Sequence, residues 1–185
     1  MSSHTDQIHK AIQILRCAEL DGRNGLPEEL FLAISGLVPL PNVDLLILNQ
    51  KKQLLLSRRC DAFFEKSWHI PGGCMRYGES FEHCIQKTAL REIGTELTFD
   101  PEPVAVRNVF RGANTALEHP NERGHNVAIL FCCWVPDTFQ INNSGKSEDE
   151  DGYLRWFNTL PSDFMKIQHV YLDVLKPWIE KKEDI

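Results

Sequence analysis

The feature that most constrains the fold is a short glycine-rich turn followed by one helix, in the segment IPGGCMRYGESFEHCIQKTALREIG, residues 70–94. Ser80 suits the N-cap of a helix, and Gly94 suits the position just past a helix end. Side chains three and four positions apart are neighbours on a helix, so residues 88, 91 and 92 share one face. Only Glu92 of these three is acidic. The pattern therefore predicts a turn and a helix that carry a single carboxylate.

The rest of the chain alternates between helical and strand periods of hydrophobic residues. Residues 5–20 repeat at helical spacing, and a second short helix is expected in residues 26–36, where Pro27 suits the first turn. The expected strands span residues 43–49, 53–59, 104–110, 125–135 and 153–157. Residues 67–73 are interpreted as leading into the loop, and residues 162–182 as a closing helix. Irregularly interleaved strands and helices favour a mixed α/β sandwich.

The composition excludes several classes of protein. The 185 residues are 42% hydrophobic and 25% charged, which is typical of a soluble globular domain. A net charge of −6 argues against nucleic-acid binding, which needs a basic face. No apolar run approaches the ~20 residues of a membrane helix, and the N-terminus lacks the plan of a signal peptide. The six cysteines include no CxxC pair, so we expect no structural zinc site and a reduced, cytoplasmic protein.

The segment from Gly73 to Gly94 resembles the box of the Nudix hydrolases, which cleave nucleoside diphosphates linked to another group. The family pattern is Gly, five residues, Glu, seven residues, Arg-Glu, two residues, Glu-Glu, one residue and Gly. The chain keeps Gly73, Glu79, Glu92 and Gly94 in register, whereas Lys87, Thr88 and Arg91 replace the arginine and two metal-binding glutamates. The resemblance implies a Nudix α/β/α sandwich with a mixed sheet in residues 26–185, after an N-terminal helical extension in residues 1–25. It also implies that Glu79 and Lys87 pair and fix the loop on the helix.

One branch of the family, the GDP-mannose mannosyl hydrolases, shows the same losses, and residues 26–49 are similar to its N-terminal segment. This resemblance implies a Mg²⁺ ion, or Mn²⁺ in its place, and a homodimer in which N-terminal segments reach the partner's site. Arg59 matches the diphosphate contact, Asp44 a sugar contact and Phe31 a contact of the nucleobase. Leu26 belongs to the segment that reaches across the dimer. The adjacent Arg58 is interpreted as a surface charge, because neighbouring strand residues face opposite sides.

The acidic loop at residues 142–152 is where the chain departs from that branch. The branch has a glutamine metal ligand and a histidine base there, and counting back from Arg155 puts Glu150 and Asp151 at those places. The implied metal ligands are therefore Gly72, Glu92 and Glu150. The implied base is Asp151, with Glu150 beside it, and Arg59 neutralises the leaving group. The alternative bases are Glu148, Asp149, His119 and His125. Asn126 stands where the branch has a tyrosine near the sugar.

Three functions are consistent with these residues. The first is a Mg²⁺-dependent hydrolase of nucleoside diphosphate sugars, similar to GDP-mannose, in which water attacks the anomeric carbon and releases nucleoside diphosphate and free sugar. The second is a conventional Nudix pyrophosphatase that attacks phosphorus, with the acidic loop supplying the missing metal carboxylates. The third is a non-catalytic module that binds nucleotide sugars, which the survival of Gly72 and Glu92 disfavours.

Overall fold

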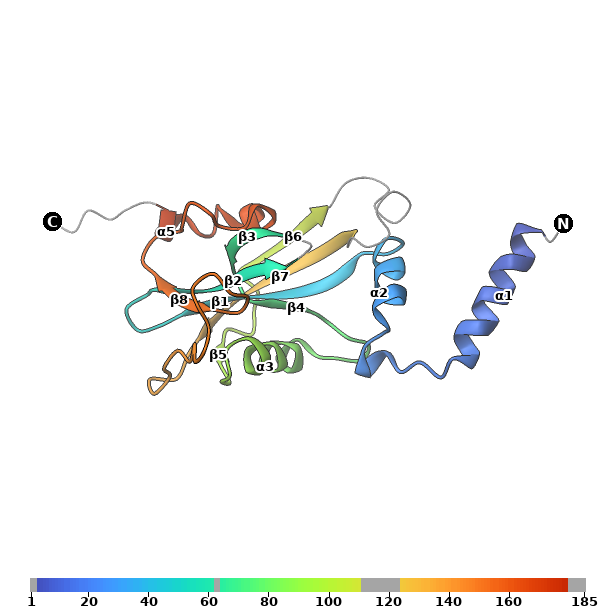
Figure 1. The fold of residues 1–185 in the computed structure, drawn as a ribbon, viewed down its shortest axis with the longest axis horizontal. Helices are drawn as coiled ribbons and strands as arrows, with labels where there is room; N and C mark the ends of the chain where they lie inside the picture. The colour runs from blue at the N-terminus through green and yellow to red at the C-terminus, as the bar shows by residue number, and fades with distance from the viewer. Residues whose placement is uncertain (1–2, 62–63, 111–123, 180–185) are drawn as a thin grey trace.

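The computed structural model describes residues 3–61, 64–110 and 124–179, in which helices surround one sheet (Figure 1). The helices are α1 (His4–Cys17), α2 (Glu28–Ser35), α3 (Phe81–Glu92) and α5 (Lys176–Ile179), with the 3-10 helices η1 (Gly22–Asn24) and η2 (Lys166–Tyr171). The strands are β1 (Leu40–Leu48), β2 (Leu54–Asp61), β3 (Phe64–His69), β4 (Gly72–Cys74), β5 (Thr98–Phe99), β6 (Ala105–Phe110), β7 (His125–Trp134) and β8 (Leu154–Phe157).

The described residues form an 8-stranded mixed sheet with β1 near its centre. Strands β3, β2, β1, β7 and β5 follow one another across the sheet, while β4 pairs with β1, β6 with β7 and β8 with β2. Strands β1 and β7 run parallel, from Leu40 opposite Asn126 to Leu48 opposite Trp134. The remaining strand pairs of the described residues are antiparallel. The predicted mixed α/β fold is confirmed.

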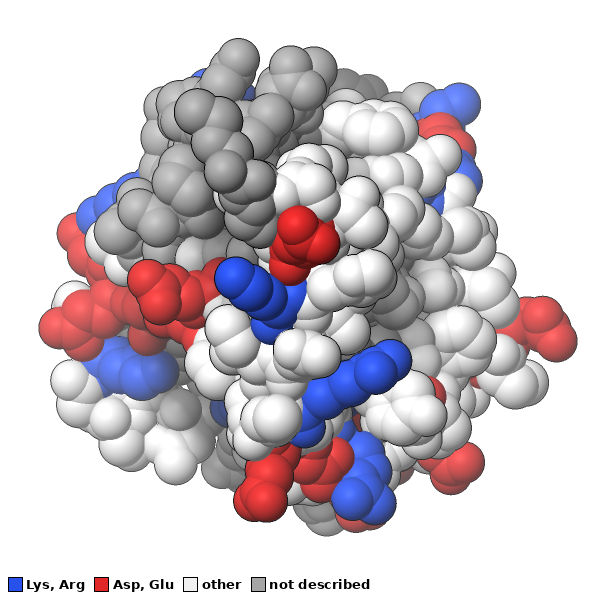
Figure 2. All heavy atoms as spheres, turned by 90° about the vertical axis from the view of Figure 1, so that its right-hand side faces the viewer, with Lys and Arg blue, Asp and Glu red and all other residues white. Residues whose placement is uncertain are grey.

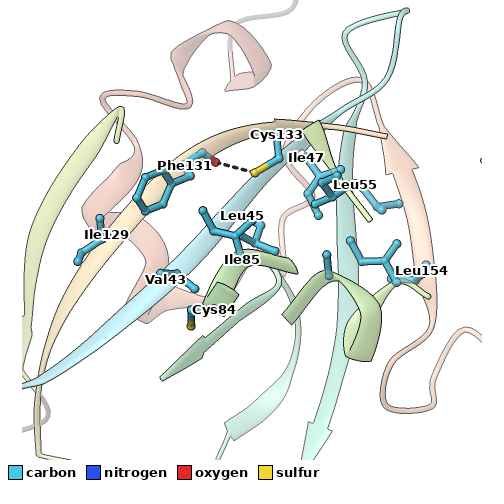
Figure 3. Close-up of a cluster of buried hydrophobic side chains, with 13 residues drawn as sticks. Val43, Leu45, Ile47, Leu55, Cys84, Ile85, Ile129, Phe131, Cys133 and Leu154 are labelled. Atoms are coloured by element: carbon cyan, nitrogen blue, oxygen red, sulfur yellow. Dashed lines mark hydrogen bonds between the residues drawn. The ribbon is translucent and has the colours of Figure 1, made fainter. Parts of the chain in front are cut away.

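Strand β1 separates two hydrophobic clusters, because successive side chains of a strand point to opposite faces. Val43, Leu45 and Ile47 pack against residues of α3, as Figure 3 shows. Leu46 belongs to the other cluster, which the C-terminal segment covers with Tyr171 and other side chains. Helix α3 therefore lies on one face of the sheet, and η2 with α5 lies on the other (Figure 1). This arrangement is the expected sandwich.

The cysteines of the first cluster are thiols packed as small apolar side chains. All six cysteines are free. The Cys133 thiol donates a hydrogen bond to the Phe131 carbonyl at 3.5 Å (Figure 3). Burial raises the pKa of Cys133 above its usual range and that of Cys84 to about 12, so both stay protonated at neutral pH.

Helix α3 begins and ends where its sequence predicts. The Ser80 side chain accepts a hydrogen bond from the His83 amide at 3.1 Å, and Gly94 has a φ of 79°, which favours glycine. The expected ion pair of Glu79 and Lys87 is present, and Glu79 also accepts a hydrogen bond from the Arg76 amide at 2.8 Å. The loop before α3 is therefore fastened to the helix.

Residues 67–73, which were expected to lead into the loop, include the end of β3 and the start of β4. The end of β3 pairs with β2, with Ser57 opposite His69. Strand β4 pairs with β1, which puts Gly72 directly opposite Asp44. The glycine turn is thus part of the sheet.

Arg58 is not a surface charge, so that interpretation is wrong. Its side chain is 9% exposed, and Nη1 donates to Asp163 Oδ2 at 2.5 Å. The guanidinium also lies 5.0 Å from the ring centroid of Trp68. The C-terminal segment covers this arginine, supplies its counter-charge and removes it from solvent.

The expectation of a single closing helix is also wrong. The segment instead forms η2 and the short α5. The Gln168 amide donates to the Met165 carbonyl at 3.0 Å, and the Leu172 amide donates to the His169 carbonyl at 3.1 Å, which is the tighter 3-10 pattern. Both Gln168 and Tyr171 are buried against the sheet. Their tertiary contacts outweigh the helical periodicity of the segment.

Helix α1 projects away from the sheet, as Figure 1 shows, and has no buried residue. Ser3 and Asp6 form a capping box at its start.

On the face from which α1 projects, acidic and basic side chains are scattered among uncharged ones (Figure 2). Among the described residues, no helix has the length and apolar character needed to cross a bilayer. The boundary at residue 25 remains a prediction.

Candidate functional site

A polar pocket lies beside η2, where the ends of several strands meet the C-terminal segment. Of the residues predicted for the site, it brings together Asp44, Arg59 and Gly72. Its other polar lining residues are Asn42, His69, Asn126, Gln168 and Tyr171. The pocket therefore combines one arginine with several groups that can form hydrogen bonds to a neutral polar ligand.

Asp44 is held inside the pocket by two donors. Tyr171 Oη donates to Oδ2 at 2.7 Å, and Asn42 Nδ2 donates to Oδ1 at 3.0 Å. Burial raises the pKa of Asp44 to about 7, although both hydrogen bonds act to lower it. A carboxyl with this pKa exists in both protonation states near neutral pH. It can therefore accept or donate a hydrogen bond.

Gln168 holds the strand end that leads into the glycine turn. Its Oε1 accepts from the Ile70 amide at 2.7 Å, and its Nε2 donates to the Ile70 carbonyl at 2.9 Å. The side-chain amide thus pairs with the backbone as a neighbouring strand would. Sequence reasoning missed Gln168 and Tyr171, whose partners lie 98 and 127 positions away. Their one sequence signal is a glutamine inside an otherwise apolar stripe.

His69 is a second residue that sequence reasoning missed. Its Nδ1 lies 2.9 Å from the Ile70 carbonyl, and a carbonyl only accepts, so Nδ1 carries the proton. Burial lowers the pKa of His69, Arg59 lowers it further, and Glu92 and Asp151 raise it. The ring is therefore a neutral imidazole whose Nε2 is an acceptor. The charges of Arg59, Glu92 and Asp151 all reach it.

Asn126 is a further polar residue of the pocket lining. Its Oδ1 is buried, and no described residue donates a hydrogen bond to it. A buried acceptor of this kind costs free energy unless a ligand or water supplies a donor. The neighbouring His125 is engaged elsewhere, because its Nε2 lies 3.2 Å from Asn108 Oδ1 and its ring stacks on Phe110. His119, another alternative base, lies outside the described residues.

Two of the three predicted metal ligands, the Gly72 carbonyl and the Glu92 carboxylate, share one hydrogen-bond donor, whereas the third, Glu150, bonds within its own loop. Arg91 bonds to both, because Nη2 donates to Gly72 O at 3.0 Å and to Glu92 Oε1 at 2.8 Å. A carbonyl and a carboxylate are oxygen donors of the kind that Mg²⁺ takes. Within the described residues, however, no three His, Cys, Asp or Glu side chains gather to hold a metal. The donor pair fits a cation that takes its remaining ligands from water or substrate.

Only glycine fits at position 72. A Cβ there would lie 2.3 Å from Asp44 Oδ1 and 2.8 Å from the Val43 carbonyl. The close approach of β4 to β1 therefore needs a residue without a side chain. This close approach also brings the Gly72 carbonyl, which lies beside Glu92, next to the Asp44 pocket.

Each acid of the acidic loop has a partner, and three of the four partners lie outside the loop. Asp151 Oδ1 accepts from the Cys60 amide at 3.1 Å, which ties it to β2 next to Arg59. Glu150 accepts from the Ser147 amide at 2.9 Å, within its own loop. Glu148 pairs with Arg155, and Asp149 pairs with Lys66. Asp151 is thus the acid of this loop that bonds to the residue next to Arg59.

Leu26 and Phe31 lie on the N-terminal side and are half-buried. Phe31 belongs to α2, and neither residue is part of the pocket lining. The structure of one chain therefore does not bring them to Asp44 and Arg59.

Comparison with known proteins gives a consistent result. A family model described as the NUDIX domain matches residues 38–160. A NUDIX hydrolase from Nitrosomonas europaea is similar over 73% of this chain and 70% of its own, at 18% identity and a TM-score of 0.51. The MutT protein from Methanosarcina mazei Go1 is similar over 70% of this chain and 90% of its own, at 21% identity and a TM-score of 0.48. A UDP-X diphosphatase is similar over 91% of this chain and 83% of its own, at 20% identity and a TM-score of 0.48. The matched region includes α3 and the turn before it.

Proposed function

The chain belongs to the Nudix hydrolases, and on that premise we propose that it hydrolyses a nucleoside diphosphate sugar at the anomeric carbon. In this reaction the water oxygen forms a bond to the carbon, and the bond from that carbon to the diphosphate oxygen breaks. The products are a nucleoside diphosphate and a free sugar. GDP-mannose is the first substrate to try, because of the resemblance of the box and the N-terminal segment to that branch.

The observation that carries this proposal is the set of acceptors in the pocket. Asn126 Oδ1 lacks a donor among the described residues, and Asp44 is held with both oxygens facing polar partners. Sugar hydroxyls are donors as well as acceptors, whereas an ionised phosphate only accepts. A sugar would therefore satisfy the pocket better than a second phosphate would.

The anionic part of the substrate belongs near Arg59. A planar guanidinium can bond two phosphate oxygens at once. Glu92 and the Gly72 carbonyl would hold the divalent metal, with Glu150 as the further ligand that the resemblance implies. Bound Mg²⁺ would neutralise charge that develops on the departing diphosphate. Arg59 provides the same stabilisation from the protein itself.

The attacking water needs a group that takes its proton. We propose Asp151 for this role, with Glu150 beside it, because Asp151 is tied to β2 next to Arg59. His69 is the competing candidate, since its neutral ring lines the pocket and Nε2 can accept a proton. The variants Asp151→Asn and His69→Asn distinguish these two candidate bases.

Leu26 and Phe31 enter the proposal through a homodimer in which the nucleobase lies against the partner's N-terminal segment. The support from the structure is a line of exposed apolar side chains on α1, Ile8, Ile12 and Leu15. A soluble monomer gains nothing from such a stripe unless it is covered. Light scattering of the full chain should give twice the monomer mass.

The test is hydrolysis of a panel of nucleotide sugars in ¹⁸O-water with Mg²⁺, followed by mass spectrometry of both products. Attack at carbon labels the free sugar and leaves the nucleoside diphosphate unlabelled. Label on phosphate, with nucleoside monophosphate and sugar phosphate as products, would replace the proposal by pyrophosphatase chemistry. No turnover of any substrate in the panel would favour the binding module.

A further inference from the structure

Arg91 occupies the side of α3 that faces the glycine turn. Its Nη2 is within hydrogen-bond distance of both the Gly72 carbonyl and Glu92 Oε1, and its Nε lies 3.0 Å from the same carboxylate oxygen. The side chain of Arg91 is 53% exposed, whereas that of Glu92 is 23% exposed. One guanidinium therefore bridges the two oxygens on which the proposed metal position depends.

A guanidinium and a divalent cation compete for the same lone pairs. Glu92 Oε1 accepts two bonds from Arg91, and these charge-assisted bonds satisfy the oxygen that would otherwise coordinate a cation. The positive charge of Arg91 also opposes a second cation at this short distance. A metal that uses both Oε1 and the Gly72 carbonyl can enter only if the guanidinium moves away.

The surroundings of Arg91 permit that movement. Its side chain is half-exposed, so it can leave without opening the hydrophobic core, whose α3 members are Cys84, Ile85 and Ala89. The positions of Gly72 and Glu92 do not depend on it, because β4 pairs with β1 and Glu92 ends α3. The Gly72 carbonyl and the backbone of Glu92 therefore stay in place when the guanidinium moves.

We propose that Arg91 is a built-in cation that competes with divalent metal for Gly72 and Glu92, so that metal binds tightly only together with a diphosphate. The diphosphate supplies oxygens to the metal and an anionic partner to the displaced guanidinium. Metal and diphosphate therefore strengthen each other's binding, and this coupling passes through Arg91. The inference rests on the proposed metal position but not on which bond of the substrate is broken.

The test is direct titration of Mn²⁺ with the full-length protein, followed by electron paramagnetic resonance of the free ion. Arg91→Ala should bind Mn²⁺ about tenfold more tightly than the wild type, a difference of ~1.4 kcal/mol. The matched control is Arg16→Ala, which removes the same charge from the exposed helix α1. It should bind Mn²⁺ as the wild type does. Equal Mn²⁺ affinity of Arg91→Ala and wild type would overturn the proposal.

A second titration in the presence of GDP tests the coupling. GDP should raise the Mn²⁺ affinity of the wild type several-fold more than it raises that of Arg91→Ala, because the variant has no guanidinium to displace. By thermodynamic linkage, Mn²⁺ should raise GDP affinity by the same factor. An equal effect of GDP in both proteins would contradict the inference.

A double variant locates the metal. Arg91→Ala with Glu92→Gln should lose the tightened Mn²⁺ binding, since the carboxylate ligand is gone. Retention of tight binding would show that the ion lies elsewhere and would overturn the inference. Neither titration measures hydrolysis. The Mn²⁺ affinities therefore test the role of Arg91 even if the protein does not catalyse the proposed reaction.

Discussion

Substitution of Gly72 by alanine tests the close contact of β4 with β1, which joins the Asp44 pocket to the Gly72 carbonyl beside Glu92. The new Cβ would lie 2.3 Å from Asp44 Oδ1 and 2.8 Å from the Val43 carbonyl. Neither oxygen can retreat, because Asn42 holds that Asp44 oxygen and Val43 is backbone within the sheet. Strand β4 must therefore separate from β1.

The expected cost follows from comparison with the adjacent glycine. Forcing a methyl group into a packed site costs about 1–3 kcal/mol, and we expect ~3 kcal/mol for Gly72→Ala because both obstacles are fixed. At Gly73 a Cβ would meet Thr88 Oγ1 at 2.7 Å and Arg91 Nη2 at 3.2 Å. These atoms belong to side chains and give way more easily, so Gly73→Ala should cost ~1 kcal/mol. In a chain of this size, the melting temperature should fall by roughly 6–12 °C and 2–4 °C respectively.

Urea unfolding of both variants, with the slope m compared to that of the wild type, measures the two costs. Adding Asp44→Ala to Gly72→Ala removes the nearer obstacle, so the pair should cost less than the sum of the single changes, with a coupling of about 0.5–3 kcal/mol. A Gly72→Ala protein as stable as the wild type, or less affected than Gly73→Ala, would refute the reasoning.

Four further predictions follow from the site. Glu92→Gln should keep the fold and lower turnover severely, with partial rescue by excess Mg²⁺; an unchanged Mg²⁺ dependence would remove Glu92 from the metal position. Arg59→Lys keeps the charge but loses the planar fork, so kcat/KM for diphosphate sugars should fall by a factor corresponding to about 1.5–3 kcal/mol, and a value within about twofold of wild type would place the diphosphate elsewhere. Asp151→Asn should abolish turnover if Asp151 is the base. His69→Asn keeps a donor for the Ile70 carbonyl but removes Nε2, so it should abolish turnover if the His69 ring is the base. Measuring kcat of both variants distinguishes the two bases. The Asp44 carboxyl has a pKa of about 7 in the folded protein and of 3.8 when unfolded. Its contribution to stability is therefore complete below pH 3.8 and is lost as the pH rises from 3.8 to about 7. Melting temperatures measured in EDTA should show this decline in the wild type and not in Asp44→Asn.

The central helix and the strands that carry the core could be predicted from the sequence because their signals are local. Ser80 and Gly94 mark the ends of α3 through interactions within a few residues, and Glu79 pairs with Lys87 only eight positions away. The first hairpin follows from two apolar runs around a polar turn, and its pairing of Leu48 with Leu54 is short-range.

The wall of the pocket could not be predicted because its contacts join distant parts of the chain. Tyr171 and Asp44 are 127 positions apart, and Arg58 and Asp163 are 105 apart. The periodicity of the C-terminal segment is helical, yet buried hydrogen bonds to the sheet favour a 3-10 turn there. His69 was missed for a related reason, since its role depends on a bond to the next carbonyl and on charges from three other elements.

The position of η2 after the strands of the sheet also has a consequence for folding during synthesis. The eight strands of the described residues have been translated by Phe157, but Gln168, Tyr171 and Leu175 have not. Until these residues are available, Leu46 and Leu130 lack this cover, and Ile70 and Asp44 lack the hydrogen bonds that Gln168 and Tyr171 supply. The wall of the pocket is therefore completed only after the strands of the sheet have been translated. A chain truncated after β8 should therefore expose an uncovered apolar face of the sheet, which chaperones would recognise.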